Sequence, residues 1–194
     1  MSIDSDPRAR GNKLALADAP DRNMHSFGSP KSLTFDEVEA AAWSLACELF
    51  NAGIRRDDVI LVQLPNITEH VITKLALELL GASVKSVAMN ENSEYLGTIA
   101  KTHPVTAYIS TTDYHGESFT CSHQAAFPDG TLILAFGETE PESAQLIGET
   151  IADIEALDAC QQYVRKERVN STNAIDLAAF PIDLALHKIA KEGP

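Results

Sequence analysis

The sequence lacks the glycine-rich motifs with which many α/β proteins hold nucleotide phosphates. It has no G-x-G-x-x-G, no Gly-Lys-Ser/Thr P-loop and no G-x-S-x-G, and its 10 glycines are scattered along 194 residues. Backbone N–H groups must approach a phosphate closely, and glycine at a strand-to-helix turn allows this. The first turn of this kind is Leu64-Pro65-Asn66, in which proline has no N–H to donate. We therefore expect no phosphate cradle there.

Cysteines are few and widely spaced. Cys47, Cys121 and Cys160 are odd in number and far apart, so they predict neither a disulfide framework nor a paired metal site. This usage favours a reducing compartment, and we expect a cytoplasmic protein. The first residues contain no apolar stretch typical of a secretory signal. No apolar run approaches the roughly 18–20 residues of a membrane span.

Basic residues are scarce relative to acidic ones. The chain has 15 Lys and Arg against 28 Asp and Glu, which gives a net charge of −13. Phosphates would be repelled, so the composition argues against nucleic acid as a partner. Hydrophobic residues make up 44% of the chain and aromatic residues only 6%. These values predict a mostly aliphatic core, in one domain or one domain with a small appendage.

A strand, a sharp turn and a helix over residues 58–82 organise the chain. Val59 to Leu64 are mostly aliphatic, as in a buried strand. Asn66 is expected to cap the following helix, with Glu69 completing a capping box. Gly81 stands where a left-handed residue ends a helix. This is half of a βαβ unit.

Similar units continue on both sides and predict an α/β fold, with a mostly parallel sheet and helices on both of its faces. Thr34 and Glu37 form a capping box for a helix that Gly53 ends. Further strands are expected at 83–89, 105–110 and 131–136. A short helix is expected at 94–101, with Tyr95, Leu96 and Ile99 pointing inward.

The expected organisation has three parts. Residues 1–31 form an extended lead-in, in which only Leu14 to Ala17 resemble a strand. Residues 32–160 form the α/β subdomain, with one or two helices over 143–160. Residues 161–194 form a C-terminal segment, with a partial strand at 175–180 and a helix at 181–191 that has proline in its first turn.

No catalytic, cofactor-binding or metal-binding residue is predicted from the motifs. His115, Cys121 and His123 are the only close group of soft metal ligands, and without a fourth ligand they are interpreted as part of a polar loop. His70 is interpreted as a solvated helical histidine. Cys47 is interpreted as a small core residue. The acidic groups Asp57-Asp58 and Glu138/Glu140/Glu142 are interpreted as solvated turns.

Three segments between residues 33 and about 110 resemble the N-terminal part of the adenylate-forming superfamily, the AMP-binding acyl-CoA synthetases and ligases. They are Leu33-Thr34-Phe35-Asp36-Glu37-Val38, Asn51-Ala52-Gly53-Ile54-Arg55-Arg56-Asp57-Asp58-Val59, and Leu64-Pro65-Asn66 with Glu69 and Leu79-Leu80-Gly81-Ala82. Their order and spacing agree with the family. One departure is Asp57, which replaces the usual glycine.

The resemblance implies ATP-dependent activation of a carboxylic acid to an acyl-adenylate and transfer to CoA, as in fatty acid metabolism. ATP, Mg and CoA are implied only for a full-length relative. The family's phosphate loop should follow 176–180, but Pro181 to Leu186 stand there instead. We therefore expect a chain that is truncated before that loop and is inactive alone. Its expected partner is the missing downstream domains, a partner chain or a second copy. An exposed apolar surface is expected where that partner binds. The alternatives are a stand-alone interaction or scaffold module of the same fold, or an unrelated Rossmann-like binding protein.

Overall fold

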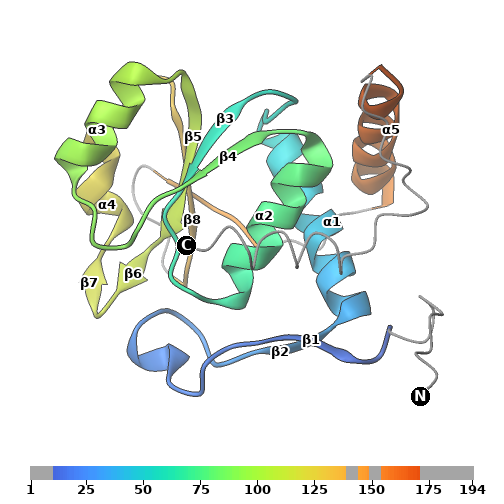
Figure 1. Ribbon diagram of the computed structural model, residues 1–194, viewed down its shortest axis with the longest axis horizontal. Coiled ribbons are helices and arrows are strands. Elements are labelled where there is room, and N and C mark those ends of the chain that lie inside the picture. Colours follow the sequence, from blue (N-terminus) through green and yellow to red (C-terminus); the bar gives the residue numbers. More distant parts are fainter. Residues whose placement is uncertain (1–10, 139–143, 149–153, 171–194) are drawn as a thin grey trace, which may run out of the picture.

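The computed structural model describes residues 11–138, 144–148 and 154–170. Its centre is a five-stranded parallel sheet with the order β4-β3-β5-β8-β9 (Figure 1). The strands are β3 (Val59–Val62), β4 (Ser83–Ser86), β5 (Val105–Thr111), β8 (Leu132–Phe136) and β9 (Gln145–Leu146). Every neighbouring pair is parallel. The predicted α/β fold class is confirmed.

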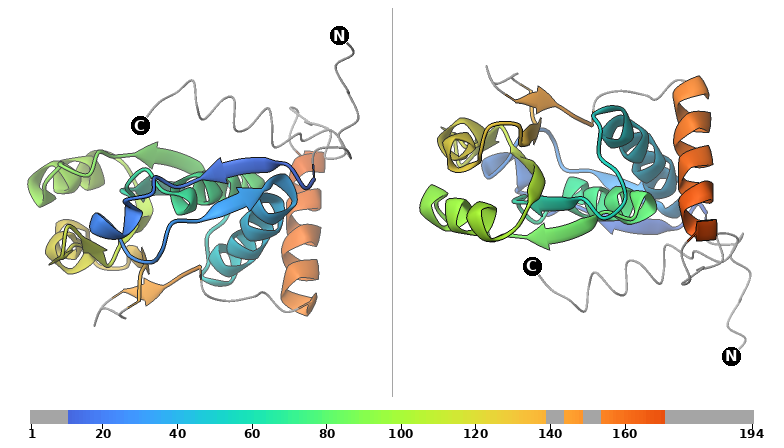
Figure 2. Two further views of the ribbon diagram at one scale, coloured as in Figure 1. Left: turned by 90° about the horizontal axis from the view of Figure 1, so that it is seen from below. Right: turned by 90° about the horizontal axis from the view of Figure 1, so that it is seen from above.

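Helices cover both faces of the sheet. They are α1 (Phe35–Asn51), α2 (Thr68–Leu80), α3 (Ser93–Thr102), α4 (Thr120–His123), the short 3₁₀ helix η3 (Gln124–Ala126) and α5 (Ile154–Asn170). Successive side chains of a strand point to opposite faces of the sheet, so the side chains of β3 contribute to a hydrophobic core on each face. Ile60 and Val62 pack with α1 and α2, whereas Leu61 packs with Leu96 of α3 and Tyr108 of β5. Figure 2 shows α5 along the outer side of α1.

Local signals placed several helix ends correctly. Glu37 N donates to Thr34 Oγ1 at 3.4 Å and Thr34 N donates to Glu37 Oε2 at 2.8 Å, so the predicted capping box of α1 is present. Gly81 ends α2 with φ +76°, in the left-handed region that glycine adopts without strain. The structure adds a third local cap, at α3, where the Asn92 side chain accepts from Tyr95 N at 3.0 Å.

The predicted cap of α2 is wrong. The N-cap residue is Ile67, and Asn66 is exposed. Thr68 N donates instead to Asp18 Oδ1 at 2.7 Å, and the Glu69 carboxylate accepts from Arg22 and from the Thr68 hydroxyl rather than completing a capping box. A carboxylate 50 residues away in the chain replaces the local cap, which a local pattern does not reveal.

The segment after β8 also differs from the prediction. Residues 145–146 form β9, the outermost strand of the sheet, where a helix was expected. Short apolar runs do not distinguish a strand from a helix by spacing alone. The helix α5 begins at Ile154 and continues past Cys160 to Asn170. The strand predicted at 175–180 and the helix predicted at 181–191 lie outside the described residues.

The N-terminal segment packs against the helices α1 and α2. β1 (Leu14–Ala17) pairs antiparallel with β2 (Ser32–Thr34), and the 3₁₀ helix η2 (Arg22–Met24) lies between them. The predicted strand at 14–17 is therefore confirmed. An extended lead-in does not describe residues 18–31, because Arg22 is only 3% exposed. Ion pairs, described below, overcome the cost of burying it.

A small hairpin stands beside this segment. β6 (Asp113–Tyr114) and β7 (Glu117–Ser118) are joined by His115 and Gly116, whose φ angles are +52° and +78°. Two positive φ angles are the signature of a type I′ turn.

Large hydrophobic side chains are exposed at only three described positions. Leu14 lies on β1, Met24 on η2 and Tyr95 on α3, and these elements are separate (Figure 1). Tyr95, predicted to point inward, is 47% exposed because the buried side of α3 is formed by Leu96 and Ala100. In the described part of the chain, no helix combines the length and the apolar character that crossing a membrane requires.

Candidate functional site

A cleft of about 590 Å³ opens at the carboxyl ends of β8 and β9, which we call the carboxyl-edge cleft. Its walls are largely apolar: Leu45 comes from α1, Ile72 from α2, Phe136 from the end of β8 and Ile147 from just beyond β9. The loop at Phe27 and Gly28 forms its rim. Parallel sheets place ligands at the carboxyl ends of their strands, so this is the expected edge for a site.

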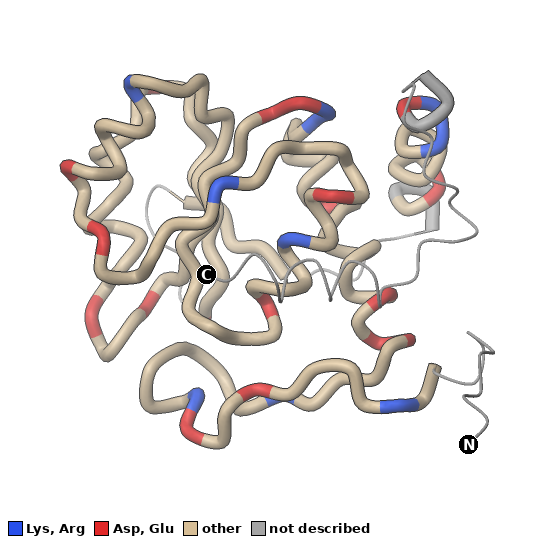
Figure 3. The backbone as a smooth tube through the Cα atoms, viewed as in Figure 1, with Lys and Arg blue, Asp and Glu red and all other residues tan. Residues whose placement is uncertain are grey.

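An ionic cluster lies at one end of the cleft. The Arg22 guanidinium donates to Glu69 Oε1 at 2.9 Å and to Asp18 Oδ2 at 2.5 Å. Lys31 Nζ adds a third contact, to Glu69 Oε1 at 2.6 Å. Figure 3 shows the acidic first turn of α2 facing the charged residues of the N-terminal segment. Two cations and two carboxylates balance in charge, and each has an opposite partner.

The cluster holds its groups in their charged forms. Desolvation raises the pKa of the Glu69 carboxyl, but hydrogen bonds from Arg22 and Lys31 outweigh it and keep the pKa below its usual value. The pKa of Asp18 is lowered for the same reason, with desolvation opposed by Arg22 and two backbone N–H groups. A base that is satisfied in this way is poorly suited to accept a proton. We therefore interpret the cluster as a clamp between the N-terminal segment and α2.

The residue that follows β3, Gln63, uses its side chain for hydrogen bonds inside the protein. Gln63 is fully buried: its Nε2 donates to the carbonyl oxygens of Ala88 and Glu91, and its Oε1 accepts from Tyr108 Oη at 2.6 Å. In sequence order the five strands lie 2-1-3-4-5 across the sheet, so the strand order reverses between β3 and β5. Between these two strands, the side chains of Gln63 and Tyr108 are hydrogen-bonded to each other. Burial also raises the pKa of the Tyr108 hydroxyl.

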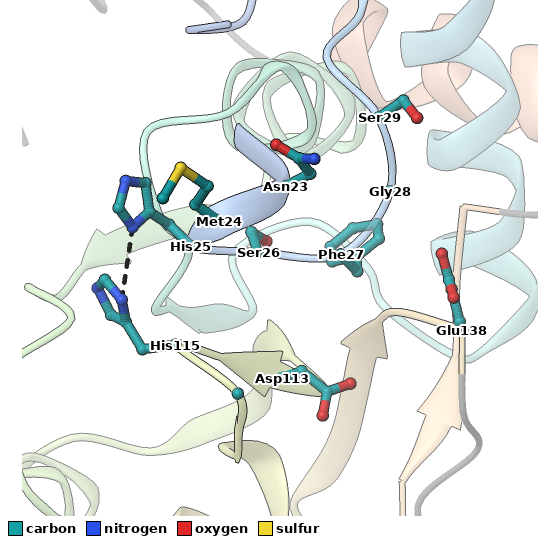
Figure 4. Close-up of a pocket in the computed structure, with 11 residues that line it drawn as sticks. Asn23, Met24, His25, Ser26, Phe27, Gly28, Ser29, Asp113, His115 and Glu138 are labelled. Atoms are coloured by element: carbon teal, nitrogen blue, oxygen red, sulfur yellow. Dashed lines mark hydrogen bonds between the residues drawn. The ribbon is translucent and has the colours of Figure 1, made fainter. Parts of the chain in front are cut away.

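A second cavity, of about 450 Å³, adjoins the first at Phe27, Gly28 and Glu138. His25 and His115 face each other in it, with their Nδ1 atoms 3.4 Å apart (Figure 4). His115 had been grouped in sequence with Cys121 and His123. The structure brings it to His25 instead, while His123 Nδ1 contacts the carbonyl oxygen of Phe119 at 2.9 Å. No three potential metal-ligating side chains converge anywhere in the described part.

Cys47 and His70, two further residues considered in the sequence, are both buried. Cys47 is a buried core residue, as predicted, and it contacts the buried thiol of Cys160, whose pKa burial raises to about 12. His70 is not solvated: it is 9% exposed, and burial lowers its pKa to about 4. Loss of contact with water and the positive charge of Lys74 both disfavour the imidazolium.

Solved structures share this fold. Acyl-CoA synthetase from Brucella canis matches with a TM-score of 0.57 and 20% identity, over 76% of this chain and 24% of that one. The luciferase-like enzyme of the mealworm Zophobas morio matches with 0.61 and 16%, over 79% and 33%. Acetoacetyl-CoA synthetase from Streptomyces lividans matches with 0.61 and 19%, over 76% and 24%. This chain thus spans between 24% and 33% of the length of these proteins.

Two comparisons of the sequence with known proteins gave different results. No curated protein matches it significantly. The family model described as "AMP-binding enzyme" matches residues 6–180 of the 194, which includes the three segments that resemble adenylate-forming enzymes. The chain therefore belongs to the AMP-binding enzyme family.

Proposed function

We propose that this chain acts as the N-terminal part of an ATP-dependent carboxylic acid:CoA ligase and that by itself it does not activate acids. Membership of the AMP-binding family supports this, as does the likeness to acyl-CoA synthetases over a quarter of their length. The family excludes the third alternative, an unrelated Rossmann-like protein. Action on fatty acids in the cytoplasm belongs to the same proposal.

One observation supports a structural rather than a catalytic part in such a ligase: among the described residues, Gln63 and the ions of the clamp are already paired within the protein. Pro65 also lacks an N–H. What the carboxyl edge of the sheet does present is the apolar carboxyl-edge cleft. An apolar cleft suits a neighbouring segment of protein or an acyl group better than a triphosphate. The domain thus supplies a wall to a site whose phosphate-binding loop comes from elsewhere.

The test is ATP–pyrophosphate exchange by the pure 194-residue chain with short-, medium- and long-chain carboxylic acids. We expect no exchange above the rate without enzyme, because no described group is placed to hold the triphosphate. A full-length acyl-CoA synthetase assayed in parallel shows that the conditions permit the reaction. Exchange that requires both the carboxylic acid and the 194-residue protein would contradict the proposal.

The second candidate is a stand-alone interaction module, and the same cleft favours it. A ligase part requires the family's phosphate loop, whereas an interaction module does not. Adding the phosphate-loop-containing remainder of a related synthetase, expressed as a separate chain, distinguishes the two. Restored exchange supports the ligase part, and stable binding without exchange supports the module.

A further inference from the structure

Two histidines that are 90 residues apart in sequence meet beside the carboxyl-edge cleft. His25 lies just after η2, and His115 lies in the β6–β7 turn. Their Nδ1 atoms are 3.4 Å apart, and their rings meet edge to face with an interplanar angle of 68° and centroids separated by 4.8 Å. Figure 4 shows both rings at the cavity that Asp113 and Glu138 also line. Neither the clamp nor the cleft uses this pair.

The backbone fixes the approach of the two residues. His115 N donates to His25 O at 3.1 Å, so the two main chains are joined directly. The type I′ turn sets the direction of His115, and the Tyr114 ring packs edge-on against its imidazole with centroids 4.3 Å apart. The pair is therefore held in place by contacts other than the one between the rings.

The spacing suits a metal ion. Zinc binds imidazole nitrogen at about 2.0–2.1 Å, and at a tetrahedral angle two such nitrogens lie about 3.3–3.4 Å apart. The other nitrogen of His25, Nε2, lies 3.3 Å from Asp21 Oδ2. A carboxylate that accepts from Nε2–H leaves Nδ1 unprotonated and free to coordinate, which is the usual outer support of a metal-bound histidine.

We propose that His25 and His115 form a two-histidine site for a divalent transition-metal ion of the zinc class. Water completes the coordination, and the carboxylates of Asp113 and Glu138 add negative charge to the same cavity. Imidazole selects such ions over hard ions such as Mg²⁺. The ion would fasten the loop at 22–28, which forms the rim of the cleft, to the β6–β7 hairpin. This inference does not depend on the proposed ligase role.

The experiment is calorimetric titration of the untagged 194-residue chain with Zn²⁺, and with Mg²⁺ as a control. We expect one Zn²⁺ per chain and no Mg²⁺ binding. His25→Gln and His115→Gln should each weaken Zn²⁺ binding by about tenfold or more, because each removes one ligand. His103→Gln, at the exposed end of α3, should bind like the wild type and is the matched control.

A second measurement locates the ion independently of affinity. In the NMR spectrum, Zn²⁺ should shift the ring signals of His25 and His115 and leave those of His103 in place. The same spectra show whether each variant is folded. No binding by the wild type, or equal binding by all variants, would overturn the site. Binding that survives both substitutions but is lost in Cys121→Ser would assign the ion to that exposed thiol instead and would also overturn it.

Discussion

His70 is a buried imidazole that the helix pattern alone would place in water. Its Nε2 has no hydrogen-bond partner among the described residues, and the residue is 9% exposed. Burial lowers its pKa to about 4, aided by the nearby positive charge of Lys74 and opposed by a hydrogen bond with the Pro65 backbone. The side chain is therefore neutral in the folded protein at pH 7.

This burial makes stability fall in acid. The pKa is near 6.5 when unfolded and about 4 when folded, so between these values the unfolded chain binds more protons. The full unfolding free energy is present above pH 6.5 and decreases as the pH falls towards 4. The decrease caused by His70 amounts to about 2 kcal/mol at pH 5. Replacing His70 by Leu should remove this part of the loss. Urea unfolding at pH 7.5 and pH 5 measures it, with His103→Gln as control. Parallel losses in wild type and His70→Leu would contradict the prediction.

The helices α1 and α2 begin in different ways. α1 is capped by its own sequence through Thr34 and Glu37, whereas α2 is capped through tertiary structure by Asp18. The second arrangement depends on the clamp, because the same Asp18 side chain also binds Arg22.

Substitutions at the two caps should therefore differ in effect. Thr34→Ala should cost about 1 kcal/mol of unfolding free energy, the usual value for a lost N-cap. Asn66→Ala should change it by less than about 0.5 kcal/mol, since Asn66 is exposed and caps nothing. Urea titration followed by the fluorescence of the single tryptophan, Trp43, measures both. An equal loss at the two positions would mean that Asn66 caps α2 in solution.

The sequence was informative where the signal was local. Apolar runs revealed β3, β5 and β8, and Gly81 ended α2 as its type predicts. It was uninformative where distant segments meet. No pattern indicated that Arg22 would reach Glu69 across 47 residues, and nothing paired His25 with His115. Both contacts arise because the N-terminal segment packs against α1, the start of α2 and the β6–β7 turn, which is a property of the topology and not of any local motif.

At the scale of the whole molecule, α5 belongs to the main core. Cys160 and Val164 are buried with α1 and the sheet. Tyr163 Oη accepts from Arg56 N at 2.8 Å, and its ring contacts that of Phe50 with centroids 5.0 Å apart. The boundary expected at residue 160 would therefore divide a helix whose next turn is packed against α1.

That boundary can be tested by comparing chains that end at residues 160 and 170. The shorter chain loses Tyr163 and Val164, and we expect its unfolding free energy to be lower by about 3 kcal/mol or more, because burying each such side chain contributes roughly 1.5–3 kcal/mol. Trp43 fluorescence in urea measures the difference. Val164→Ala in the longer chain should reproduce part of the loss, whereas Gln162→Ala, at an exposed position of α5, should not. If both chains unfolded at the same urea concentration, α5 would be dispensable and the subdomain would end at residue 160.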